Sequence, residues 1–227
     1  MTQIDWSSHQ GRRTRSNNDA AAVGRKGHYL LAMLVDAAEK GDGQALARHW
    51  AQIIVRNALA ANEPPSTASL IDVMRVEQHK LRHQHLHAVA SYCCALVDLR
   101  LEQLHLLHAG DCRAGIRQNS GHIDWLTRPH DLSQQPIWPA SYAEASQYRH
   151  MLTRSLNAKR FYVPECQNIP FSTDTSLVLC SDGYWYEHQQ LGVALQEVDD
   201  DTSILALQPN KPAPAPTISE GLFIISV

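Results

Sequence analysis

The sequence lacks an excess of basic residues, a long apolar run and a CxxC pair of cysteines. Its 20 Lys+Arg are outnumbered by 23 Asp+Glu, which gives a formal net charge of -3 at pH 7. A protein that coats nucleic acid needs the opposite sign, so nucleic acid is not an expected partner. No apolar run approaches the roughly 20 residues of a membrane span. Residues 1–9 also lack the apolar core of a signal peptide, so we expect no membrane association and a cytoplasmic location.

None of the five cysteines forms a CxxC pair. This excludes a zinc knuckle and a thioredoxin-type redox site, and it predicts reduced, partly buried thiols. The length of 227 residues, with 44% hydrophobic and 19% charged residues, suits one folded domain. We place that domain at residues 1–208. Residues 209–227 then form a Pro/Ala-rich linker and a C-terminal tail or last strand.

The apolar pattern predicts a strand, then two helices, then mostly strands. The run 29–35 is typical of a short buried strand, and residues 44–60 have helical spacing. Ser66 is expected to cap a second helix that extends to about His87. Further strands are expected at 90–97, 101–109, 113–117, 123–126, 176–180 and 203–207, with a helix within 141–156. Strands and helices segregated in this way indicate an α+β fold.

Aspartates stand at the ends of several apolar strands: Asp19, Asp36, Asp111, Asp182 and Asp200. Carboxylates that converge at one edge of a sheet repel one another unless a cation lies between them. Oxygen ligands alone select hard cations such as Mg²⁺ or Mn²⁺. Two such ions can share a bridging carboxylate and activate a water molecule for attack on a phosphoryl group. The simpler alternative is that each aspartate caps a turn or a strand end.

Seven short motifs follow one another in a characteristic order. They are GRRTRSNND at 11–19, VD at 35–36, AGDCRA at 109–114, LTRPHDL at 126–132, LTRSLN at 152–157, LCSDGYW at 179–185 and DDTS at 200–203. Together they resemble the motifs of the metal-dependent Ser/Thr protein phosphatases, the protein phosphatase 2C or PPM group, and especially its compact bacterial members. The resemblance implies an αββα sandwich, in which two antiparallel sheets are flanked by helices.

The resemblance also implies roles for the aspartates. Asp36 would bridge two Mn²⁺ or Mg²⁺ ions, and the main-chain carbonyl of Ala37 would be a further ligand. Asp182 and Asp200 would complete the second ion's site, which makes these two and Asp36 the expected catalytic residues. Asp19 would contact the ions directly or through water, and Asp111 would be a ligand of a third, more weakly bound ion. The expected activity is hydrolysis of phosphoserine or phosphothreonine in proteins by a metal-activated water, without a phosphoenzyme intermediate. The enzyme would reverse the phosphorylation carried out by a cognate Ser/Thr kinase.

The sequence departs from the family pattern in five places, two of which are Asn18 in place of the usual Glu and Asn157 in place of a Gly. The glycine-rich stretch that follows the family's Asp-Gly is replaced by Ala37 and the residues 38–43. The family's phosphate-binding arginine aligns with Thr14, so Arg13 or Arg15 would have to bind phosphate by a one-residue shift. The segment 183–199 is short and leaves room for one short helix at most.

These departures keep a second hypothesis open. The chain would then be a pseudo-phosphatase that binds a phosphoprotein or another partner, its turnover weakened by the altered 36–43 loop. Ions between Asp36, Asp182 and Asp200 would favour the enzyme, whereas Lys40 or an arginine in that space would favour the binding module. A third hypothesis is a phosphatase directed at a small phosphorylated metabolite.

Overall fold

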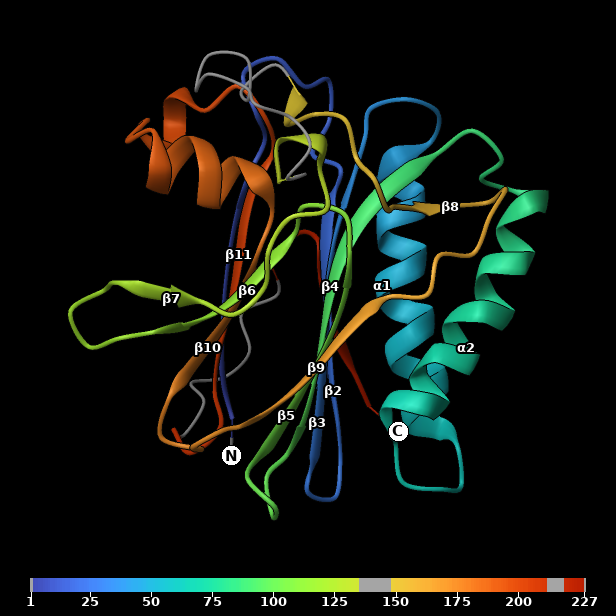
Figure 1. Ribbon diagram of the computed structural model, residues 1–227, viewed down its shortest axis with the longest axis vertical. Helices are drawn as coiled ribbons and strands as arrows, with labels where there is room; N and C mark the ends of the chain where they lie inside the picture. The colour runs from blue at the N-terminus through green and yellow to red at the C-terminus, as the bar shows by residue number, and fades with distance from the viewer. Residues whose placement is uncertain (1, 135–147, 212–218, 227) are drawn as a thin grey trace.

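Two β-sheets stack face to face in the computed structural model, which describes residues 2–134, 148–211 and 219–226 (Figure 1). The five-stranded sheet has the order β1 (Gln3–His9), β11 (Thr202–Gln208), β10 (Ser176–Cys180), β6 (Arg113–Arg117) and β7 (Ile123–Trp125). The seven-stranded sheet has the order β12 (Leu222–Ile225), β2 (Asp19–Lys26), β3 (Tyr29–Ala37), β4 (Val89–Asp98), β5 (Gln103–Ala109) and β9 (Glu165–Pro170), and β8 (Leu156–Asn157) pairs with β4. The expected α+β sandwich is confirmed.

Two antiparallel helices cover the outer face of the seven-stranded sheet, to the right in Figure 1. They are α1 (Gly43–Ala60), which begins at the N-cap Asp42, and α2 (Thr67–Lys80). Ser66 caps α2 as predicted, in a reciprocal capping box with Ser69. Trp50 of α1 is fully buried in the core that these helices form with the sheet.

The strand β3 is buried on both faces, which explains its continuous apolar run. Leu31, Met33 and Val35 face the helices, and Leu30 and Leu34 face the five-stranded sheet. Alternate side chains of a strand point to opposite faces, so a strand covered on both sides needs apolar residues at every position. The run ends at Asp36, where the strand reaches the upper end of the sandwich in Figure 1.

A short π-helix, Gly183–Gln190, covers part of the outer face of the five-stranded sheet. Its buried Trp185 packs with Val178 and Ile204 and donates a hydrogen bond from Nε1 to the carbonyl of Asp111 at 2.8 Å. The segment 183–199 adds a second short helix, the 3₁₀ turn Leu195–Glu197, where we predicted one at most.

Other boundaries also differ from the sequence predictions. The second helix ends at Lys80 and continues only as the 3₁₀ turn Leu81–His83. Residues 141–147 of the helix predicted within 141–156 lie outside the described residues, and Leu152 forms an isolated bridge with Asp131. Among the described strands, β12 pairs with β2 in parallel, unlike the antiparallel pairs elsewhere. In the described ranges no helix is both long and apolar enough to cross a bilayer.

Candidate active site

Register places a row of polar side chains across three neighbouring strands at the end of the seven-stranded sheet. Asp19 of β2 is paired with Asp36 of β3, and Asp36 is paired with Ser91 of β4. Ser91 Oγ in turn donates to Asp111 Oδ1 at 2.6 Å. A side chain at Gly110 would meet Ser91 Oγ at 2.1 Å, so only glycine allows this contact. Like charges directly opposite one another destabilise a sheet, so the row does not serve stability.

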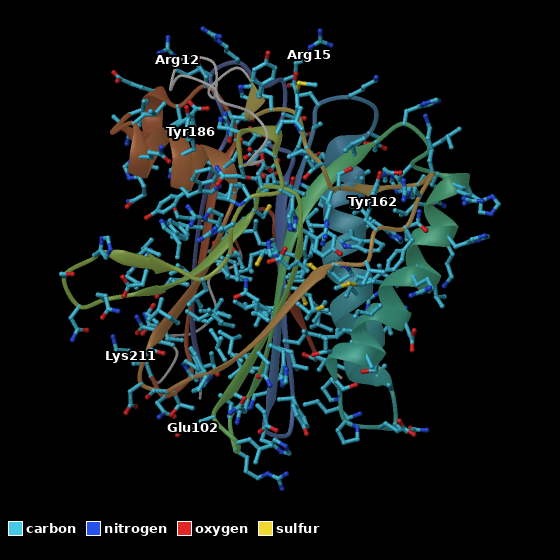
Figure 2. The ribbon with its side chains drawn as sticks, in the orientation of Figure 1. Arg12, Arg15, Glu102, Tyr162, Tyr186 and Lys211 are labelled. Carbon is cyan, nitrogen blue, oxygen red and sulfur yellow. The ribbon has the colours of Figure 1, made fainter. Side chains whose placement is uncertain are left out.

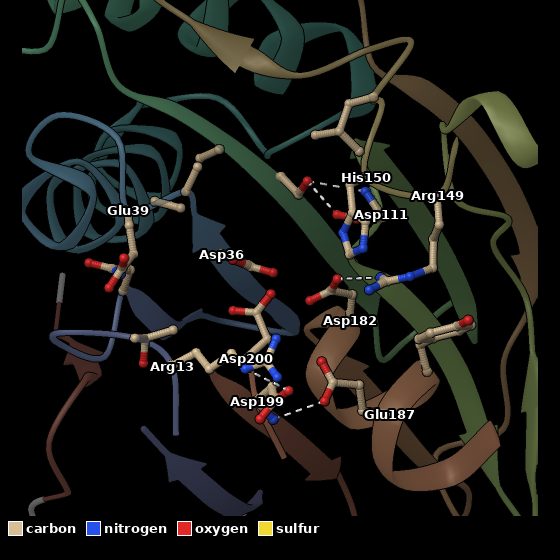
Figure 3. Close-up of a pocket in the computed structure, with 18 of the residues that line it drawn as sticks. Arg13, Asp36, Glu39, Asp111, Arg149, His150, Asp182, Glu187, Asp199 and Asp200 are labelled. Atoms are coloured by element: carbon tan, nitrogen blue, oxygen red, sulfur yellow. Dashed lines mark hydrogen bonds and ion pairs between the residues drawn. The ribbon is translucent and has the colours of Figure 1, made fainter. Parts of the chain in front are cut away.

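The five-stranded sheet brings its aspartates to the same end of the molecule. Asp182 follows β10 and Asp200 precedes β11, and these two strands are antiparallel neighbours. Ser181 Oγ bridges the sheets by donating to Asp19 Oδ2 at 2.9 Å. Figure 3 shows the carboxylates of Asp36, Asp182 and Asp200 directed towards one another across a pocket of about 710 Å³. Asp111 also lines this pocket.

Burial and neighbouring charges raise the pKa of three carboxyl groups in this pocket, those of Asp36, Asp111 and Asp200. For Asp36 burial is the largest cause, followed by the charges of Asp19 and Asp182. Burial, and then the charge of Asp182, raises the pKa of Asp111 to about 7 and that of Asp200 to about 7. Carboxyl groups shifted this far, in one pocket, are typical of a functional site.

The donor set fits a hard divalent cation. Among the described atoms, Oδ1 of Asp19 and Oδ1 of Asp182 are buried and have no hydrogen-bond partner. A buried carboxylate oxygen without a partner is unfavourable, and a bound cation would satisfy it. Ala37, the expected backbone ligand, lines the same pocket as Asp36. Asp19 lies beside Asp36 but does not line that pocket.

An arginine that the sequence did not identify reaches into the cluster. Arg149 Nη1 lies 2.6 Å from Asp182 Oδ2, and the two side chains are only 6% and 7% exposed. The guanidinium lies over the ring of Tyr186, 4.0 Å from its centroid. Burial lowers the pKa of Arg149, but Asp182, Asp111 and Tyr186 together outweigh burial and raise the pKa, so the group stays charged. Arg149 lies in a polar stretch away from any strand end, so no sequence pattern points to it.

Of the arginines considered for phosphate binding, Arg13 is the one that lines the pocket. Its side chain is 81% exposed, and its Nε lies 3.1 Å from Asp199 Oδ2. Arg12 and Arg15 lie at the upper edge of the molecule, with side chains directed outwards (Figure 2). Lys40 lines a neighbouring depression and not the space between the aspartates.

Asp201 anchors the loop that carries these arginines. It is 3% exposed. Its carboxylate accepts hydrogen bonds from Gly11 N at 2.9 Å, Thr14 Oγ1 at 2.6 Å and Asn18 N at 2.7 Å. Thr14, which aligns with the family's arginine, therefore lines the pocket but binds Asp201 through its hydroxyl group. The sequence showed Asp201 only as part of the 200–203 motif.

Asp201→Ala is expected to destabilise the protein by about 3 kcal/mol, because it leaves the buried backbone N–H groups of Gly11 and Asn18 without this acceptor. The midpoint of urea unfolding at constant m-value measures this change. Asp72→Ala, at an exposed position on α2, is the control and should shift stability by less than about 0.5 kcal/mol. An equal effect of the two substitutions would show that the loop does not depend on Asp201.

A second group of potential ligands lies beside the pocket. Among the described residues, His108, His130 and Glu165 place ligand atoms within 4.8 Å of one another. The imidazole rings are stacked, with centroids 4.4 Å apart and 9° between their planes, and one ion cannot lie in both ring planes. Gly110 N donates to His130 Nδ1, which leaves Nε2 protonated to donate to Glu165 at 3.0 Å. The cluster is better explained as support for the turn before Asp111.

Comparison with protein-family models finds no match, and neither does comparison with curated protein sequences. Solved structures do match. A bacterial serine phosphatase aligns with a TM-score of 0.73 at 18% identity, over 93% of this chain and 100% of that chain. Stp1 from Staphylococcus aureus aligns with a TM-score of 0.72 at 17% identity, over 92% and 95%.

The PPM Ser-Thr phosphatase MsPP from Mycobacterium smegmatis aligns with a TM-score of 0.68 at 17% identity, over 91% of this chain and 97% of that chain. These similarities cover nearly the whole length of both partners, and they agree with the resemblance that the motifs indicated. The chain therefore has the fold of the bacterial PPM-type serine/threonine phosphatases.

Proposed function

We propose that the chain is a Mg²⁺- or Mn²⁺-dependent phosphatase that hydrolyses phosphoserine and phosphothreonine in proteins. The observation that carries this proposal is the convergence of Asp36, Asp111, Asp182 and Asp200 in one pocket. The fold of bacterial serine/threonine phosphatases supports it. A Ser/Thr kinase would supply the phosphorylated substrate.

Asp36 would hold both ions, with the carbonyl of Ala37 as a further ligand, and Asp182 and Asp200 would complete the second ion's site. Asp19 would assist from behind Asp36, and Asp111 would serve a third ion. When bound, such ions lower the pKa of a bound water molecule towards neutral pH, and their positive charge stabilises the phosphoryl oxygens.

Arg13, which lines the pocket, would bind the phosphoryl group. Its partner Asp199 is 42% exposed, and exposed ion pairs of this kind contribute little to stability. The guanidinium can therefore exchange Asp199 for phosphate oxygens, which suit its planar geometry. Arg15, which lies outside the pocket, remains the alternative phosphate-binding residue.

One observation favours the second candidate, a pseudo-phosphatase that binds a phosphoprotein or another partner. Arg149 already supplies a positive charge to Asp182, at 2.6 Å, as a bound ion would. A guanidinium held in this way compensates one carboxylate without any metal. It leaves Asp36 and Asp200 without a cation of their own among the described residues.

Hydrolysis of p-nitrophenyl phosphate and of a phosphothreonine peptide, each with Mn²⁺, with Mg²⁺ and with EDTA, tests the proposal. We expect metal-dependent turnover that EDTA abolishes and that Asp182→Asn lowers by roughly 10³-fold. Asp72→Asn, on the far helix, is the control. Turnover of the small phosphate alone would point to a metabolite phosphatase. If folded protein shows no turnover with any metal, the proposal that the chain is an enzyme is wrong. Binding of a phosphoprotein by that inactive protein would then support the pseudo-phosphatase.

A further inference from the structure

Arg149 is surrounded by acidic groups from three parts of the chain. Asp182, after β10, contacts it directly, while the charges of Asp111, after β5, and Asp131, after β7, also act on it. Its Nε is buried and has no hydrogen-bond partner among the described atoms. The guanidinium is thus held mainly by Asp182 and by the face of Tyr186.

The two ends of the carboxylate cluster differ in charge compensation. The charged groups that act most strongly on Asp36 are four other aspartates, and no cation is among them. Asp182, by contrast, accepts a hydrogen bond from the Arg149 guanidinium at Oδ2, while its Oδ1 has no hydrogen-bond partner among the described atoms. Both partners are almost fully buried, so the solvent screens this end of the pocket very little.

A divalent ion that bound Asp182 would lie close to the positive charge of Arg149. It would either face that charge with little screening or displace the guanidinium from the carboxylate. Breaking a buried ion pair by leaving one partner uncompensated is unfavourable. An ion held by Asp36 and the carbonyl of Ala37, away from Arg149, would not face this positive charge.

We propose that Arg149 is a tethered cation that competes with a divalent ion for the Asp182 end of the cluster, so that the two ends bind metal with unequal affinity. This inference rests on the proposed function, because it concerns the same ions. Occupancy of the site should therefore depend on metal concentration. The first ion binds while Arg149 remains paired with Asp182, and the second binds only at an ion concentration high enough to compete with Arg149.

Isothermal titration of the metal-free protein with Mn²⁺ measures both ions directly. We expect two unequal binding steps in the wild-type chain. In Arg149→Gln the weaker step should tighten at least about tenfold, while the stronger step changes little. Arg13→Gln removes an exposed arginine from the same pocket and should leave both steps within about twofold. Figure 3 shows the two arginines on opposite sides of the carboxylates.

The opposite result would overturn the inference. If Arg149 instead orients Asp182 for the ion, Arg149→Gln will bind Mn²⁺ more weakly or not at all in the second step. Equal affinities in Arg149→Gln and the wild type would also overturn it while leaving the proposed function intact. An absence of Mn²⁺ binding from both proteins would overturn the proposed function and this inference together.

Folding of the variants is checked by circular dichroism and a thermal melt in EDTA. If Arg149→Gln does not fold, Arg149→Lys replaces it, because lysine keeps the charge but loses the planar contact with Tyr186. Its weaker step should then tighten by a few-fold relative to the wild type, and an unchanged or weaker step would overturn the inference.

Discussion

Asp36→Asn is expected to abolish metal-dependent hydrolysis and, at the same time, to stabilise the metal-free protein. Asp36 lies between Asp19, its partner across the sheet, and Asp182 and Asp200 from the other sheet. Removing the central bridging carboxylate should lower kcat/KM by roughly 10³-fold or more. Removing one of several repelling charges should raise the free energy of unfolding in EDTA by about 1 to 2 kcal/mol. This corresponds to roughly 2 to 8 °C in Tm.

The two effects have opposite signs, which separates a functional residue from a structural one. A substitution that only damaged the fold would lower activity and Tm together. Asp72→Asn, exposed on α2, should change neither. A lower Tm for metal-free Asp36→Asn would show that the carboxylate is a structural acceptor. Activity that survives the substitution would remove Asp36 from the proposed site.

The candidate site was predictable to the extent that its residues stand at strand ends. The continuous apolar run of β3 ends at Asp36, and the equally apolar β10 is followed by Ser181 and Asp182. Apolar runs of this length predict buried strands, and buried strands fix where their ends lie. The helix α1 and the cap at Ser66 follow from equally local signals.

The residues that were missed depend on contacts between distant parts of the chain. The strands β1 and β9 lie at sheet edges and alternate half-buried with exposed residues, so they have no apolar run to mark them. Arg149 meets Asp182 over 33 positions of sequence, and Asp201 meets Gly11 over 190. No periodicity reports such pairs, because their proximity arises only in the folded chain; Gly11 and Asp201, for example, meet just beyond the end of the β1–β11 strand pair.

The metal-free protein should lose stability as pH rises from about 6.5 to 8. The pKa of Asp111 and that of Asp200 are each raised to about 7, by burial first and then by Asp182. A carboxyl group whose pKa is raised on folding contributes stability that is fully present below its unfolded pKa, near 3.8, and is lost as pH rises through about 7. His108 acts in the opposite direction, since burial lowers its pKa to about 4, but it titrates mainly below this window.

Across this window the two carboxyl groups together should account for a loss of about 1 to 2 kcal/mol, or roughly 2 to 8 °C in Tm. Thermal melts in EDTA at several pH values measure it. Saturating Mn²⁺ should flatten or reverse the trend, because the ion binds the deprotonated carboxylates and stabilises the state that the rising pH produces. The reversal is the decisive part. Carboxylates that merely cap turns would give the same melting curves with and without the ion, and the aspartates would then have no role in binding metal.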